Sequence, residues 1–130
     1  MTVTYKARGK LDHPVSDLNE ARVFLREHGQ NMHEYIYPDE AKPGVHSVTW
    51  DLLDEESWEV TLIADYELEQ QQINDLSDWI LGQNSDGLGE SFEQQPFAEH
   101  EQYNDEDEEP EYAMSSFDWQ INPCTLEQIK

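Results

Sequence analysis

The sequence predicts an α+β fold, in which an antiparallel sheet of about four strands carries two helices on one of its faces. Two stretches, residues 2–10 and 46–64, alternate apolar and polar side chains, as strands with one buried face do. Two others, residues 17–28 and 69–81, repeat apolar residues every three or four positions, as helices do. A last alternating stretch gives the order β-α-β-β-α-β, for which a ferredoxin-like arrangement is one candidate.

The first predicted strand leads into a capped helix. Ser16 or Asp17 is the expected N-cap, and Glu20 stands three residues after Asp17, as in a capping box. Gly29 is expected to end the helix. The residues that follow, 31–44, contain two prolines and fit either a short strand or a loop.

A β-hairpin is the clearest predicted element. Its two alternating strands place their apolar residues on one face when Leu52 pairs with Trp58. The same register sets Asp51 opposite Glu59, and like charges that face each other directly are destabilising. The connecting residues, 53–57, add three more acids. A sequence selected for stability alone would place a lysine there.

The second half of the chain is predicted to hold one helix and one strand. The helix covers residues 69–81 and ends at Gly82, and residues 84–96 are expected to form a loop. The densest acidic segment, residues 99–111, is expected to be flexible. The final strand is expected over residues 117–121.

The chain is long enough for a single domain, residues 1–130, and its charge is distributed unevenly. Thirty Asp and Glu face seven Lys and Arg, for a formal net charge of −23. Residues 1–42 hold six basic residues and seven acids, whereas no Lys or Arg occurs from Pro43 to Ile129. A compact chain of this length is ~36 Å across, so its 23 acids after residue 42 give about one charge per 1.6 Å. Duplex DNA carries one per ~1.7 Å, so the charge suffices to imitate about 12 base pairs.

This charge excludes two classes of partner and favours a third. Carboxylates repel phosphates, so direct binding to nucleic acid or to an anionic membrane is not expected, and basic proteins are the favoured partners. Adaptation to high salt would spread acids over the whole chain, which the balanced first third does not fit. The one cysteine cannot form an internal disulfide, and no signal peptide or membrane-spanning run is visible, so a cytoplasmic location is expected.

The glycine-rich segment 82–93 admits three interpretations. A calcium loop with Gly87 at its sixth position would have Gly82, which offers no carboxylate, at its first. A phosphate cradle would lack its lysine. A tight turn that packs Phe92 and Phe97 against the core is favoured. The histidines show no metal-binding spacing and the cysteine has no histidine neighbour, so no catalytic residue, metal or cofactor is expected, nor any enzymatic activity.

Residues 78–94, DWILGQNSDGLGESFEQ, resemble a segment found in small acidic proteins of phages and mobile elements. The usual form there is Ser-Asp-Gly-aromatic-Gly-Glu-Gly-Phe-Glu-Gln. Leu88 replaces the aromatic residue and Ser91 replaces the glycine that follows Glu, so the match is partial. In size and charge the chain is also similar to anti-CRISPR and anti-restriction DNA mimics. The resemblance implies a mobile-element origin and a counter-defence role, and it assigns no catalytic residue.

These observations predict an acidic DNA mimic that blocks the basic DNA-binding cleft of a host defence nuclease, a CRISPR effector or a restriction enzyme. The partner is thus a basic DNA-binding protein, and the oligomeric state is left open. The expected contacts are made by sixteen acids: Asp51, Asp54, Glu55, Glu56, Glu59, Asp75, Asp78, Asp86, Glu90, Glu93, Asp105, Glu106, Asp107, Glu108, Glu109 and Glu111.

Two alternatives stay open. The first is an acidic protein–protein adaptor of a phage or mobile element, whose charge serves solubility only and whose contacts are made by Tyr35, Tyr37, Tyr103 and Tyr112. The second is a calcium-responsive module built on the glycine-rich segment. Salt-dependent binding in competition with DNA would favour the mimic over both.

Overall fold

The computed structural model describes residues 2–29, 32–37, 39–102, 111–114, 117–118 and 126–129. Side chains are described for these residues except 85–86, 99–102, 111–114 and 117–118. In chain order the elements are β1 (Val3–Leu11), α1 (Leu18–His28), the 3-10 turns η1 (Met32–Tyr35) and η2 (Asp39–Ala41), β2 (Val45–Asp54), β3 (Ser57–Ala64), α2 (Gln70–Asp86), α3 (Leu88–Glu93), the 3-10 turn η3 (Pro96–Ala98), β4 (Glu99–Gln102), β5 (Glu111–Met114), β6 (Phe117–Asp118) and β7 (Glu127–Ile129).

The main sheet is antiparallel and runs in the order β2-β3-β1. On the far edge of β1, β6 pairs with residues 10–11 and β7 pairs with residues 4–6, so two short segments share the fourth position of the sheet. The predicted α+β class, with an antiparallel sheet of about four strands, is confirmed. The ferredoxin-like arrangement stays a prediction, because the fourth position is divided between two segments.

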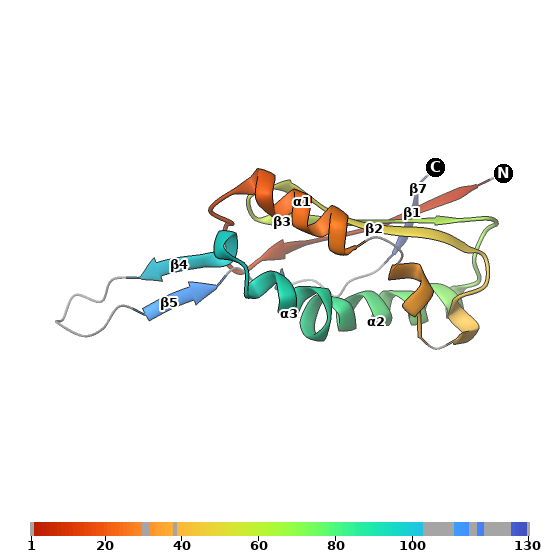
Figure 1. Ribbon diagram of the computed structural model, residues 1–130. Coiled ribbons are helices and arrows are strands. Elements are labelled where there is room, and N and C mark those ends of the chain that lie inside the picture. The colour runs from red at the N-terminus through yellow and green to blue at the C-terminus, as the bar shows by residue number, and fades with distance from the viewer. Residues whose placement is uncertain are drawn as a thin grey trace.

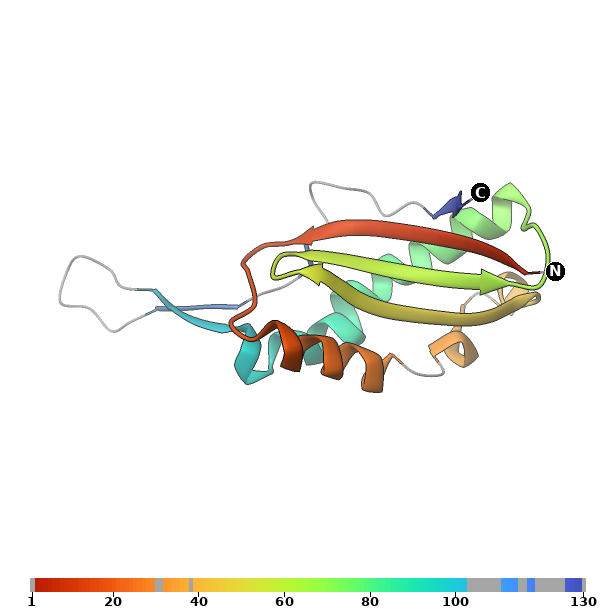
Figure 2. The same ribbon diagram turned by 90° about the horizontal axis from the view of Figure 1, so that it is seen from above.

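One face of the sheet is covered by helices and the other is open (Figures 1 and 2). α2 and α3 lie beneath the covered face, and α1 runs alongside β2 (Figure 2). The alternation of the strands explains this arrangement, since every second side chain points to the same face. The buried members are Tyr5, Ala7 and Leu11 of β1, Val48, Trp50 and Leu52 of β2, and Trp58, Val60, Leu62 and Ala64 of β3.

Aromatic side chains dominate the core between the sheet and α2. Trp50 is fully buried, its indole N–H donates to Asn84 Oδ1 at 2.9 Å, and its ring meets that of Trp79 edge to face at 5.8 Å. The buried Tyr5 hydroxyl accepts from the Leu68 backbone N–H at 2.8 Å. The Trp50 indole and the Tyr5 hydroxyl thus each have a partner in the low-dielectric core, where an unpaired polar group is costly. These contacts fix α2 against β2 and hold the residues just before α2 against β1.

The helix α1 begins and ends as predicted. Asp17 is its N-cap, and its carboxylate accepts from the Glu20 backbone N–H at 3.1 Å. Phe24 and Leu25 are among its buried residues, and Gly29 follows its last turn. The region between α1 and β2 forms the 3-10 turns η1 and η2 in the described residues rather than a strand.

The predicted end of the second helix at Gly82 is wrong, and so is the predicted loop after it. α2 continues to Asp86, and α3 follows directly after Gly87. A helical glycine costs only about 1 kcal/mol, and the buried bond between Asn84 and the Trp50 indole outweighs that cost. The segment is therefore helical rather than a calcium loop. Phe92 and its predicted partner in the core, Phe97, are both buried.

A second, two-stranded sheet was not predicted. β4 and β5 pair from Glu99 opposite Met114 to Gln102 opposite Glu111, and together they project from the body of the molecule (Figure 1). The acid run 105–109 lies between them in the sequence, outside the described residues. Of the predicted final strand, residues 117–118 form β6, and the rest lies outside the described residues as well.

Candidate functional site

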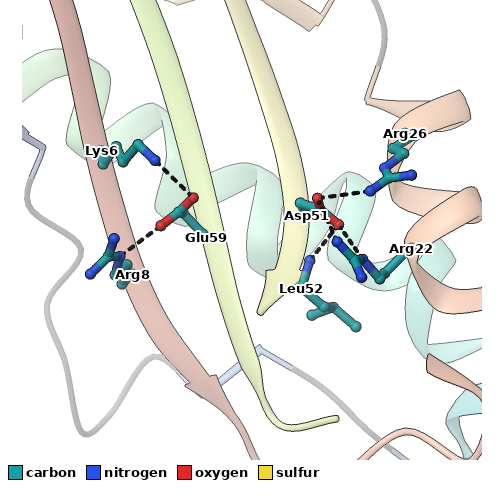
Figure 3. Close-up of polar contacts among 7 residues, drawn as sticks. All are labelled: Lys6, Arg8, Arg22, Arg26, Asp51, Leu52 and Glu59. Atoms are coloured by element: carbon teal, nitrogen blue, oxygen red, sulfur yellow. Dashed lines mark hydrogen bonds and ion pairs between the residues drawn. The ribbon is translucent and has the colours of Figure 1, made fainter. Parts of the chain in front are cut away.

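Glu59 of β3 projects from the open face of the sheet and is held by two cations of β1 (Figure 3). Lys6 Nζ lies 3.2 Å from its Oε1, and Arg8 Nε lies 2.7 Å from its Oε2. The register explains the pairing, because Arg8 stands directly opposite Glu59 across the β1–β3 ladder. Partial burial would raise the pKa of Glu59, but the hydrogen bonds from Arg8 and Lys6 outweigh it and lower the pKa.

Asp51 of β2 is held in the same way by α1, which flanks this strand (Figure 3). Arg22 Nε lies 3.1 Å from its Oδ1 and Arg26 Nη2 lies 3.2 Å from its Oδ2. Its Oδ1 also accepts from the Leu52 backbone N–H at 2.8 Å. Burial would raise the pKa of Asp51, and the three hydrogen bonds overcome that effect and lower it.

Asp51 and Glu59 face each other in the β2–β3 register, as predicted, but their charges are neutralised within the chain. Four of the seven Lys and Arg thus form ion pairs with two of the thirty acids. The rest of the chain holds 28 acids and three lysines. Of those lysines, Lys10 donates to the Ser57 hydroxyl at 2.8 Å and Lys42 to a backbone carbonyl at 3.0 Å. The open face therefore gathers five of the seven Lys and Arg around Asp51 and Glu59, and Glu127 of β7 stands opposite Lys6 at its edge. Most of the thirty acids lie elsewhere in the chain.

The β2–β3 turn carries three of the predicted acids, Asp54, Glu55 and Glu56, all of them exposed. The Asp54 carboxylate accepts from the Glu56 backbone N–H at 2.9 Å, and this hydrogen bond lowers its pKa. The Glu55 carbonyl accepts from Val15 N–H at 2.8 Å, while the next residue, Ser16, donates its N–H to Phe97 O, also at 2.8 Å. The turn and the start of the β4–β5 sheet therefore lie at the same end of the molecule.

The helices carry a second group of the predicted acids. Asp75 and Asp78 lie on α2, Glu90 and Glu93 lie on α3, and all four side chains are exposed or half-buried. Asp86 is in the last turn of α2, and Glu111 begins β5. The remaining predicted acids, residues 105–109, lie outside the described residues.

Asp75 and Asp78 border a hollow that also contains aromatic residues, which we call the tyrosine–aspartate hollow. Its lining includes Tyr35, Tyr37, Asp75, Asp78 and Trp79, and its volume is about 560 Å³. Tyr35 is 68% and Tyr37 76% exposed. The sequence indicated the tyrosines and the aspartates separately. Nothing in it placed η1 against this face of α2, which the Trp79 indole does by donating to the Tyr35 carbonyl at 3.1 Å.

Metal-binding clusters and membrane-spanning helices are both absent from the described part of the chain. It contains no group of three or more His, Cys, Asp or Glu placed to hold a metal ion. None of its helices combines the length and the apolar character that crossing a membrane requires. Comparison with family models, with curated proteins and with solved structures finds no match to the chain.

Proposed function

We propose that this protein inhibits a DNA-handling protein by occupying its basic DNA-binding cleft with carboxylates in place of phosphates. One observation carries the proposal: four of the seven Lys and Arg are concentrated on Asp51 and Glu59 at the open face of the sheet, so only three lysines remain for the other 28 acids. Carboxylates without internal partners can accept charge-assisted hydrogen bonds from Arg and Lys of another protein.

The charge distribution also orients the molecule. Five cations gather on the open face and offset the acids there, so this face attracts a basic cleft least and is expected to point away from the partner. The opposite side presents α2 and α3, and one end presents the β2–β3 turn beside the start of the β4–β5 sheet. We therefore assign the contacts to these regions and leave out Asp51 and Glu59, whose charges are already neutralised.

The resemblance of residues 78–94 to acidic phage and mobile-element proteins supports a host defence nuclease, such as a CRISPR effector or a restriction enzyme, as the partner class. The charge of the chain alone would suit any protein groove that binds DNA. Location in the cytoplasm is part of the same proposal, since such nucleases act where DNA is present.

Two variants of equal charge test the proposal. In the first, the five acids of residues 105–109 are replaced by Asn and Gln. In the control, five exposed acids elsewhere, Asp39, Glu40, Asp65, Glu67 and Glu69, are replaced in the same way. Affinity for the captured partner should fall markedly more in the first variant, and the affinity of the unaltered protein should fall steeply with salt. Equal losses would show that only net charge matters, and the mimic mechanism would be abandoned.

A second candidate function is a protein–protein adaptor, and the exposure of Tyr35 and Tyr37 favours it. Large aromatic side chains at a surface are typical of contact residues. An adaptor that binds through these rings would lose its partner when they are replaced by Ala and would keep it at high salt. The mimic would respond to salt as described above.

A further inference from the structure

The tyrosine–aspartate hollow brings aromatic rings and carboxylates together without a cation from the described part of the chain. Asp75 Oδ1 accepts from Gln71 Nε2, a neutral donor one turn earlier, at 3.1 Å. Lys42 follows η2, which packs against α2, yet its Nζ donates to the Glu34 carbonyl instead. No Lys or Arg of the described residues pairs with Asp75 or Asp78. The hollow is thus complementary to a positive charge from outside.

We propose that the hollow takes an arginine side chain of the basic partner, an inference that rests on the proposed function. A guanidinium group is planar and weakly hydrated, so it can lie on the ring of Tyr35 or Tyr37 while its N–H groups donate to a neighbouring carboxylate. A lysine ammonium is a compact, strongly hydrated charge that cannot make the same stacked and forked contact. Arginine is also one of the side chains that basic DNA-binding grooves use to hold phosphate.

Two further residues keep the hollow formed and open. The indole of Trp79 is largely buried and ties η1 to α2 through the Tyr35 carbonyl, so the site exists before a ligand arrives. Gly82 stands one turn after Asp78, and a Cβ added there would meet nothing within 4 Å. The volume of about 560 Å³ exceeds a single side chain, and it lies within the ~300–1,000 Å³ of typical ligand sites. It therefore accommodates the arginine together with its neighbouring backbone.

The test uses a blocked tripeptide, acetyl-Gly-Arg-Gly-amide, titrated into the labelled full-length protein and followed by NMR. Peptides with Lys or with citrulline, the neutral isostere of arginine, are the controls. We expect saturable shifts of the Trp79 indole N–H and of the amides at Asp75 and Asp78 with the Arg peptide. Binding should be weaker with Lys and absent with citrulline. Equal shifts with all three peptides, or shifts spread over every acidic surface, would overturn the proposal.

Variants separate the aromatic contribution from the charge. Tyr35→Ala/Tyr37→Ala should weaken the binding of the Arg peptide about tenfold or more. Tyr35→Phe/Tyr37→Phe keeps the ring faces and should leave the affinity unchanged. Asp75→Asn/Asp78→Asn should weaken it as well. A matched pair elsewhere, Glu67→Gln/Glu69→Gln, should leave it unchanged. Gly82→Leu fills the hollow without altering charge and should block binding. Retained binding in Tyr35→Ala/Tyr37→Ala would overturn the proposal.

The same variants distinguish failure of this inference from failure of the proposed function. The Tyr35→Ala/Tyr37→Ala protein could bind its partner, in competition with DNA, as tightly as the unaltered protein does. That result would support the DNA mimic and reject the arginine site. If the Arg peptide binds in the hollow but the protein captures no DNA-handling partner, the arginine site is supported and the DNA mimic is rejected. The exposure of both tyrosines makes unfolding of these variants an unexpected outcome, and circular dichroism checks it.

Discussion

Asp51 and Glu59 stand directly opposite each other across the β2–β3 ladder, and each carboxylate is held by two cations from a different element. The like-charge pair therefore joins β1, β3, β2 and α1 on one face of the sheet (Figure 3). It gathers four of the seven Lys and Arg of the chain at one place. The negative charge of the rest of the surface follows from this arrangement.

Removal of this pair should destabilise the fold. In the Asp51→Asn/Glu59→Gln protein, the two cations of β1 and the two of α1 lose their carboxylate partners. The loss of these four ion pairs exceeds the relief of the repulsion between the two acids. Because several of the side chains are more than a third exposed, the expected loss is only about 1–2 kcal/mol in the free energy of unfolding, measured by urea denaturation at pH 7.

The difference between these two proteins should depend on pH with a defined sign. The ordinary pKa values are 3.8 for Asp51 and 4.5 for Glu59, and both pKa values are lowered in the folded protein. A lowered folded pKa contributes stability that is complete above the ordinary value and is lost as pH falls through the lowered one. The two urea curves should therefore differ at neutral pH and converge below about pH 4. A gap that widens on acidification would contradict the role of these ion pairs.

Salt should stabilise the protein despite these ion pairs. Raising NaCl from about 0.01 M to about 1 M shortens the Debye length from ~30 Å to ~3 Å and screens the repulsion among the unpaired acids. The two ion-pair networks weaken at the same time, but they involve two acids of thirty. The midpoint of thermal unfolding should rise by several degrees, and less in the variant with residues 105–109 neutralised. A fall with salt would mean that paired charges dominate.

The buried bond between Trp50 and Asn84 should contribute strongly to stability. Asn84→Ala leaves the Trp50 indole N–H without an acceptor in the core, which costs about 1–3 kcal/mol. A second change, Ser91→Ala, alters an exposed side chain on the neighbouring helix and serves as the control. Urea denaturation with tryptophan fluorescence measures both. Equal stability of the Asn84→Ala protein would show that this bond does not hold α2 to the sheet.

Two glycines near the junction of α2 and α3 should respond in opposite directions to alanine. At Gly82 the added methyl meets open space, so Gly82→Ala should raise the free energy of unfolding by up to about 1 kcal/mol through helix propensity. At Gly89 the methyl would overlap the Asn84 backbone carbonyl, so Gly89→Ala should lower it. Thermal unfolding of both proteins checks the pair. Effects of the same sign would contradict the described packing of α3 on α2.

The sequence predicted the features that depend on local patterns. Alternation identified β1, β2 and β3, the pairing of Leu52 with Trp58 was recovered in the β2–β3 register, and the Asp17 cap of α1 was found from its spacing to Glu20. Each of these features is set by neighbours in sequence or by a turn of fixed length. The prediction that the second helix ends at Gly82 failed because the hydrogen bond from the Trp50 indole to Asn84 holds the following turn in the helix. This long-range bond overrides the local tendency of glycine to end a helix.

The candidate site depended on contacts between distant segments. The sequence indicated the facing acids Asp51 and Glu59, but their neutralisation requires β1 to lie next to β3 and α1 to flank β2. Lys6 and Arg8 already share the polar face of their strand in the sequence, and this was the available signal. The meeting of Tyr35 with Asp78 in one hollow had no local signal, because a 3-10 turn and a helix far along the chain create it.

Elution of captured proteins tests the central claim, that carboxylates of this chain stand in for DNA phosphates, most directly. Proteins from a cell lysate are bound to the immobilised full-length chain at low salt. They are then eluted at constant ionic strength with duplex DNA or with polyglutamate of equal charge, and identified by mass spectrometry. We expect DNA to release DNA-handling proteins at a lower charge concentration than polyglutamate does. Captured proteins that bind no DNA, or release by both polymers alike, would contradict it.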